Sequence, residues 1–89
     1  MYLSYRVVSF GSYGGDSFWT SPRFFTNELD ARLFFEETKY DPDVDGVYLV
    51  RVKTSSWSVL TEYNTGGTSI GMTPQGTIKV SRAPKLVFA

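Results

Sequence analysis

Three aspartates alternate along the segment Asp41-Pro42-Asp43-Val44-Asp45-Gly46, which is the spacing with which a calcium-binding loop begins. Carboxylate oxygens at alternate positions can surround Ca²⁺, and the glycine permits the sharp turn of such a loop. The twelfth position is Val52, where the loop needs a glutamate that binds through both oxygens. Asp and Gly also favour ordinary turns. We therefore interpret the segment as a solvated turn and predict no metal and no cofactor.

Acidic side chains are concentrated in one part of the chain. Residues 28–45 carry seven acidic and two basic side chains, whereas residues 46–89 carry five basic and one acidic. Five acids lie near the end of a predicted helix and beyond it: Glu36, Glu37, Asp41, Asp43 and Asp45. A negative surface of this kind attracts basic surfaces on other proteins, including grooves that bind nucleic acid. The alternative is a charged rim that only meets solvent.

Residue types exclude several kinds of catalysis. The 89 residues include no histidine and no cysteine, so the commonest general base and the thiolate nucleophile are both missing. Glu36 and Glu37 diverge by about 100° on a helix and cannot act together as a carboxylate pair. The glycine-rich segment 11–16 matches no phosphate-binding motif. We predict that the protein is not an enzyme.

A helix over residues 27–40 would position the acids. Thr26 or Asn27 can accept from free N–H groups of the first turn, and acids in that turn complement the helix dipole. One apolar stripe with spacings of three and four predicts the core face: Ala31, Phe34, Phe35 and Thr38. Leu29, Leu33 and Tyr40 form a second stripe. Either the glycine-rich hairpin covers this second stripe, or it is exposed and contacts a partner.

Alternating apolar residues predict strands over residues 3–10, 17–25, 47–53, 57–63, 69–72, 77–81 and 85–88. Pro22 makes the second strand an edge strand or a bulged one, and residues 73–76 have the composition of a β-turn. Strict alternation would place Trp57 and Tyr63 on one face of the fourth strand. We predict one α+β domain, residues 1–89, with a single helix on a mostly antiparallel sheet and a β-rich C-terminal tail.

No apolar run is long enough to span a membrane, and residues 1–10 lack the pattern of a signal peptide. We therefore expect a soluble, cytoplasmic protein. Direct binding of single-stranded nucleic acid is a less favoured possibility. It would use Arg51 and Lys53 together with Trp57 or Tyr63 on one sheet face.

Two resemblances bear on function. The residues Tyr5-Arg6, Trp19-Thr20-Ser21 and Glu62 are similar in order to those of mono-ADP-ribosyltransferase domains, which implies a small enzyme with Glu62 as its catalytic glutamate. Over residues 5–52, the order of a hairpin, a polar-capped helix with an inward alanine and a strand resembles small phage-encoded inhibitors, including anti-CRISPR proteins. This second resemblance is one of layout and transfers no functional residues.

The interpretation we favour is an inhibitor that binds a host protein, such as a CRISPR-Cas component, and occludes its basic surface. The acids Glu36, Glu37, Asp41, Asp43 and Asp45 would provide the charge, while Leu33 and Trp19 would provide apolar anchors. The alternatives are the transferase-like enzyme, a ligand-binding domain, or a structural subunit that forms homo-oligomers through an edge strand.

Overall fold

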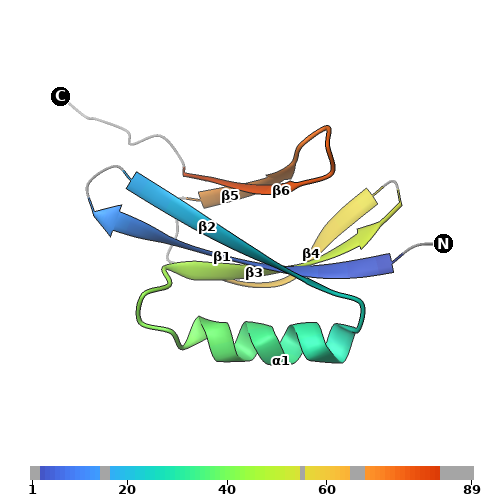
Figure 1. The fold of residues 1–89 in the computed structure, drawn as a ribbon, viewed down its shortest axis with the longest axis horizontal. Coiled ribbons are helices and arrows are strands. Elements are labelled where there is room, and N and C mark those ends of the chain that lie inside the picture. Colours follow the sequence, from blue (N-terminus) through green and yellow to red (C-terminus); the bar gives the residue numbers. More distant parts are fainter. Residues whose placement is uncertain (1–2, 15–16, 55, 65–67, 83–89) are drawn as a thin grey trace.

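The computed structural model describes residues 3–14, 17–54, 56–64 and 68–82. A four-stranded antiparallel sheet lies between one helix and a two-stranded hairpin, so the domain has three layers (Figure 1). The predicted α+β class and the predicted order of two strands, a helix and two strands are confirmed. The elements are β1 (Leu3–Gly14), β2 (Ser17–Phe25), α1 (Glu28–Lys39), β3 (Gly46–Lys53), β4 (Ser56–Asn64), β5 (Thr68–Met72) and β6 (Ile78–Arg82).

The central sheet has the strand order β2-β1-β3-β4, with β2 and β4 at its edges. β2 contains Pro22, which cannot donate to a ladder, and its edge position agrees with the sequence-based expectation. Within β3, every residue from Gly46 to Val50 is buried. A strand that is buried on both faces must be covered twice, and the helix covers only one face.

The face of the sheet toward the helix holds one hydrophobic cluster. Ala31 and Phe35 of α1 are buried there, and Phe34 packs on the cluster from the β2 side, where its ring lies 5.5 Å from that of Phe25. The strands contribute Tyr5, Val7, Val47, Leu49 and, partly buried, Leu60. The inner stripe predicted from the spacing of apolar residues therefore meets the sheet.

The β5–β6 hairpin covers the opposite face and completes a second cluster. Ile78 and Val80 of β6 are buried against Val8, Phe10, Tyr48 and Val50 of the sheet. The hydroxyl of Tyr48 makes a 2.8 Å hydrogen bond with that of Thr68, and the Asn64 side-chain amide donates to both oxygens. This polar group joins β3, β4 and β5. The C-terminal strands, predicted only as a tail, thus form a covering layer.

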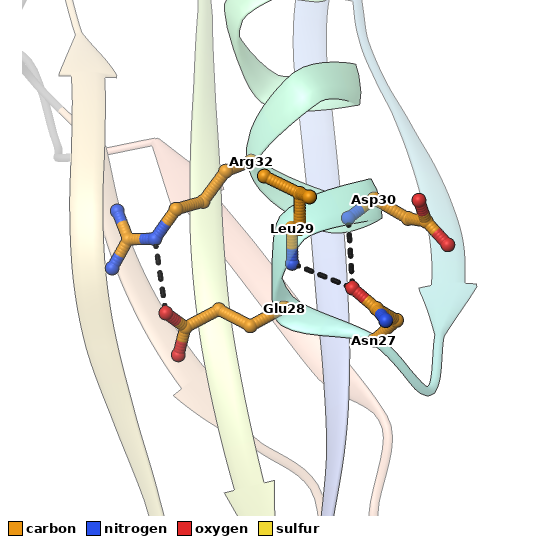
Figure 2. A network of polar contacts seen from close by, with 5 residues as sticks. All are labelled: Asn27, Glu28, Leu29, Asp30 and Arg32. Atoms are coloured by element: carbon orange, nitrogen blue, oxygen red, sulfur yellow. Dashed lines mark hydrogen bonds and ion pairs between the residues drawn. The ribbon is translucent and has the colours of Figure 1, made fainter.

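The helix begins where its polar residues indicated. Asn27 has an extended backbone, and its Oδ1 accepts from the N–H groups of Leu29 and Asp30 at 2.8 and 3.2 Å (Figure 2). These bonds satisfy two of the N–H groups that a first helical turn leaves free. Glu28 adds a 3.2 Å ion pair with Arg32 one turn later. The choice between Thr26 and Asn27 is settled in favour of Asn27.

The first strand is longer than the predicted range 3–10, because β1 continues into the glycine-rich segment as far as Gly14. Gly11 pairs with Trp19 of β2, and Ser12 pairs with Phe18. A Cβ atom at Gly11 would lie 2.6 Å from the Trp19 ring and 2.8 Å from the carbonyl oxygen of Asp43. Gly11 therefore provides space for packing, whereas a turn would have required it for a positive φ.

The prediction that Trp57 and Tyr63 share a face is wrong. The register of β4 shifts opposite Leu49 and Val50, which leaves Leu60 as an extra residue. Alternation reverses at such a bulge. Trp57 packs in the hairpin-side cluster, whereas Tyr63 pairs with Val47 on the helix side. Of the remaining predictions, the turn at residues 73–76 is confirmed by a 2.9 Å bond from Gly76 N–H to the Thr73 carbonyl, and strand 85–88 lies outside the described residues.

Candidate functional site

A groove lies between the C-terminal half of α1 and the paired strands β1 and β2. Its volume is about 460 Å³. It brings together three of the residues predicted to contact a partner, namely Trp19, Glu37 and Asp41. The remaining lining residues are Ser9, Ser21, Phe34, Thr38 and Val44. We call these eight residues the acidic groove.

Trp19 is fixed in the groove by its strand partner. Its ring lies against the backbone of Gly11, where any side chain would collide with it. Trp19 and Ser21 occupy alternate positions of β2 and so project toward the helix side, as does Ser9, the β1 partner of Ser21. The indole is half-buried, so one part packs on the protein and another part meets solvent. Such a rigid, amphipathic ring is a good anchor for a partner.

The acids at the end of the helix do not form one cluster. Glu37 is exposed on the groove side of the helix, while Glu36 lies 2.9 Å from Lys39 and is partly neutralised by it. The hydrogen bond to Glu36 is the main reason why the pKa of the Lys39 ammonium is raised above its usual value. The Lys39 ammonium also lies 5.4 Å from the centre of the Tyr40 ring.

The aspartates after the helix are used partly to shape the turn. Asp41 accepts from the N–H of Asp43 at 2.9 Å, and Asp45 accepts from the Ser12 hydroxyl at 2.9 Å. The N–H of Asp45 donates to the Phe10 carbonyl, which ties this turn to β1. Asp43 remains exposed. In the described part of the chain, no three carboxylates gather as a metal site would require.

A second surface runs along the outward face of α1. Leu29, Leu33 and Tyr40 are 66, 61 and 77% exposed, so of the two alternatives the one in which the glycine-rich hairpin covers them is wrong. The hairpin formed by β1 and β2 lies on the sheet side of the helix, and no other described element lies outside it (Figure 1). We call Leu29, Leu33, Glu36 and Tyr40 the outer helix stripe, because their spacing places them on one line along the helix.

The two surfaces adjoin. Leu33 of the stripe and Glu37 of the groove are four residues apart and are therefore neighbours on the helix. A partner that covers Leu33 would also meet the exposed carboxylates of Glu37 and Asp41. The sequence did not indicate Ser9 and Ser21, because no local pattern shows that β1 and β2 pass beneath the C-terminal end of α1.

The residues behind the other functional expectations are brought together only in part. Arg51 and Trp57 lie on opposite faces of the sheet, since their partners Tyr5 and Val52 belong to different clusters. Arg6 likewise contacts the hairpin turn, whereas Ser21 lines the groove on the helix side. Tyr63 pairs with Val47 and so lies on the same face as Arg51, and Glu62 pairs with Tyr48 on the same face as Arg6. Trp57 and Ser21 are the residues that the fold separates from these groups.

Comparison with protein-family models, curated proteins and solved structures found no match for this chain. In the described ranges no helix has the length and apolar character needed to cross a membrane. Functional inference therefore rests on the groove and the outer helix stripe themselves.

Proposed function

We propose that this chain is a protein-binding domain that docks the outer helix stripe and the adjoining acidic groove onto a basic surface of a partner protein. The observation that carries the proposal is the exposure of Leu29 and Leu33 on α1 and of Tyr40 at its C-cap. A helix that only covers a sheet needs one apolar stripe, and Ala31, Phe34 and Phe35 already supply it. Several large apolar side chains exposed on one side of a helix favour an interaction surface.

Charge indicates the chemistry of the partner. Across the described ranges, no cation lies within ion-pair distance of Glu37, Asp41 or Asp43. These carboxylates border the apolar residues Leu33 and Trp19, so a complementary surface would combine apolar pockets with lysine or arginine. Nucleic acid itself would be repelled by the same carboxylates. A protein groove that binds nucleic acid has the required charge.

Docking on such a groove would exclude its nucleic acid by steric and electrostatic occlusion. We therefore propose an inhibitory function, with a nucleic-acid-binding host protein, such as a CRISPR-Cas component, as the target. The layout that resembles phage-encoded inhibitors supports this part of the proposal.

The proposal can be tested with a photo-reactive phenylalanine analogue placed at Leu33 in cells. Lys79 is the matched control site, because it is exposed on β6, in the layer on the other side of the sheet. We expect a covalent complex with a basic protein from position 33 and none from position 79. Equal labelling from both positions, or capture only of a second copy of this chain, would contradict the proposal.

Charge reversal then tests whether the carboxylates of the acidic groove contribute to binding in addition to the outer helix stripe. Glu37→Lys combined with Asp41→Lys should weaken the complex by at least about tenfold while leaving the thermal midpoint nearly unchanged, because both side chains are exposed. The purified complex should also bind nucleic acid less well than the free partner. Binding that is insensitive to both charge reversal and salt would show that a different surface is used.

A further inference from the structure

A pocket lies on the face of the sheet that the β5–β6 hairpin covers, at the end of the molecule that carries the β3–β4 and β5–β6 turns (Figure 1). Its volume is about 440 Å³, which is within the usual size of small-ligand sites, about 300–1,000 Å³. Its lining includes Ser4 and Arg6 of β1, Val52 of β3, Met72 of β5, and Pro74 and Gly76 of the β5–β6 turn. None of these residues belongs to the acidic groove or to the outer helix stripe.

Strand alternation decides which side chains of the lining point to the pocket side of the sheet. Ser4 and Arg6 alternate along β1 and project to the hairpin side, as does Val52, the β3 partner of Ser4. Lys53 also borders the pocket, but it pairs with Leu3, so its side chain projects to the helix side. Arg6 is therefore the cation that the described lining directs toward the pocket.

The guanidinium of Arg6 is ordered, but its charge has no counter-ion nearby. It lies 5.2 Å from the centre of the Phe24 ring, and Nη1 donates to the carbonyl oxygen of Gly76. Arg6 is half-buried, and among the described residues no carboxylate forms an ion pair with it, although Glu62 lies on the same face. A guanidinium that is partly withdrawn from water without a counter-charge is unfavourable. Binding of an anion would reduce this cost, and an arginine that is already ordered loses little side-chain freedom in the process.

The contacts of Arg6 determine how an anion could bind. Its Nε is buried and has no acceptor among the described residues, so a ligand would have to bind the terminal nitrogens. Gly76 uses one donor of Nη1, and both terminal nitrogens keep at least one N–H each. A carboxylate can accept two parallel bonds from such a pair. The Ser4 hydroxyl lies about 7 Å along the same face of the strand and adds a donor beside the guanidinium.

The other wall of the pocket is apolar. Val52 and Met72 pack on the hairpin-side cluster and also line the pocket, as does Pro74. A single cation matches a single negative charge, so a monocarboxylate suits the pocket better than a phosphomonoester, which is close to dianionic at neutral pH. A ligand that fills the pocket therefore combines one carboxylate with an apolar group.

We propose that this pocket binds a small apolar monocarboxylate, with its carboxylate at the terminal nitrogens of Arg6 and its apolar part against Val52, Met72 and Pro74. This site is independent of the protein-binding surface on the helix side. It also gives the covering hairpin a second role, since the turn that Arg6 fastens forms one wall of the ligand site.

The test is a titration of the intact chain with 3-phenylpropanoate, followed by backbone amide shifts in NMR. We expect saturable shifts confined to the pocket. The neutral isostere 3-phenylpropanamide and the anion acetate should each bind at least about tenfold more weakly, because each lacks one half of the ligand. Absence of saturation up to about 10 mM 3-phenylpropanoate would overturn the proposal, as would equal binding of the amide or of acetate.

Substitution of the arginine tests the assignment of the cation. Arg6→Met keeps an unbranched apolar stem and removes the charge, so it should weaken 3-phenylpropanoate binding by at least about tenfold. Arg23→Met is the matched control, because Arg23 also stacks on an aromatic ring, that of Phe34, but projects to the helix side. It removes the same charge and should change the affinity less than about twofold. Equal losses from the two variants would indicate general attraction by positive charge and refute the site.

A second pair of variants decides the question if Arg6→Met disturbs the hairpin. Ser4→Asp places a carboxylate on the face of Arg6, where it should compete with the ligand and weaken binding by at least about tenfold. Ser4→Asn has nearly the same size without the charge, and it should weaken binding by less than about threefold. Equal affinities of the Asp and Asn variants for 3-phenylpropanoate would show that the ligand does not use Arg6.

Discussion

The glycine at position 46 offers a sharp test of the packing between the central strands. A Cβ atom there would lie 2.3 Å from Cζ of Phe10 and 2.6 Å from the carbonyl oxygen of Tyr63. Carbon atoms in contact normally lie about 3.5–4.0 Å apart. Phe10 is fully buried and Tyr63 contributes backbone, so neither can yield without displacing its neighbours.

Gly46→Ala should therefore destabilise the domain. Overpacking costs about 1–3 kcal/mol, and loss of glycine freedom in the unfolded chain offsets about 0.4–1 kcal/mol. We expect a net loss of about 1–2 kcal/mol in the free energy of unfolding, which for a domain of this size lowers the thermal midpoint by about 5–15 °C. Urea denaturation followed by circular dichroism measures the free energy directly.

Two other glycines serve as controls, because they distinguish the steric effect of an added methyl group from the cost of a positive φ. Gly71 has no atom within 4 Å of an added Cβ, and its φ is not positive, so Gly71→Ala should be neutral or slightly stabilising. Gly76 has equal space but a φ of +82°, so Gly76→Ala should cost about 1 kcal/mol through conformation alone.

The collision can also be relieved. Phe10→Leu removes the ring atoms that meet the added methyl group, so the double variant Gly46→Ala/Phe10→Leu should lose less stability than the two single variants combined. The reasoning would be refuted if Gly46→Ala matched Gly71→Ala within about 0.5 kcal/mol, or if the two substitutions acted additively.

Three further predictions concern α1. Asn27→Ala removes two bonds to backbone N–H groups and should lower the free energy of unfolding by about 1 kcal/mol, whereas Asn27→Asp should retain the stability; equal urea midpoints for both would contradict this role. Phe35→Ala should cost about 3–5 kcal/mol because the ring is buried, while Leu33→Ala should change stability by less than about 0.5 kcal/mol, and similar losses would mean that Leu33 is covered. Glu36→Gln should return the pKa of Lys39, followed by NMR, toward its ordinary value of about 10.5. The pKa of Lys39 is higher in the folded protein than in the unfolded chain. The ion pair therefore stabilises the fold fully at pH values below the pKa of the unfolded chain. This stabilisation disappears as the pH rises through the pKa of the folded protein.

The local features of the fold could be predicted from the sequence. Asn27, the first-turn acids and the inner stripe fix the bounds of α1, because capping and helical spacing act within a few residues. The turn at residues 73–76 and the edge position of the strand with Pro22 follow from proline and glycine in the same way. Each depends on contacts between residues close together in the chain.

The candidate site was predicted only in part. Trp19, Glu37 and Asp41 meet in the acidic groove, and Leu33 adjoins it. Glu36 pairs instead with Lys39, and Asp45 is held by Ser12. The positions of the acids along the chain could not show which carboxylates line the groove and which are already paired. That depends on which side chains the helix and β1 place beside each carboxylate.

The sequence by itself thus determined the element types, the helix bounds and the presence of two apolar stripes, since periodicity records which residues share a face. Only the tertiary structure decided which surfaces are covered. It placed β5 and β6 over the second face of the sheet and left the outer helix stripe exposed. It also reversed the faces of β4 at Leu60 and gave Gly11 its role beneath Trp19. These outcomes depend on strand pairing and packing between distant residues, which local patterns do not specify.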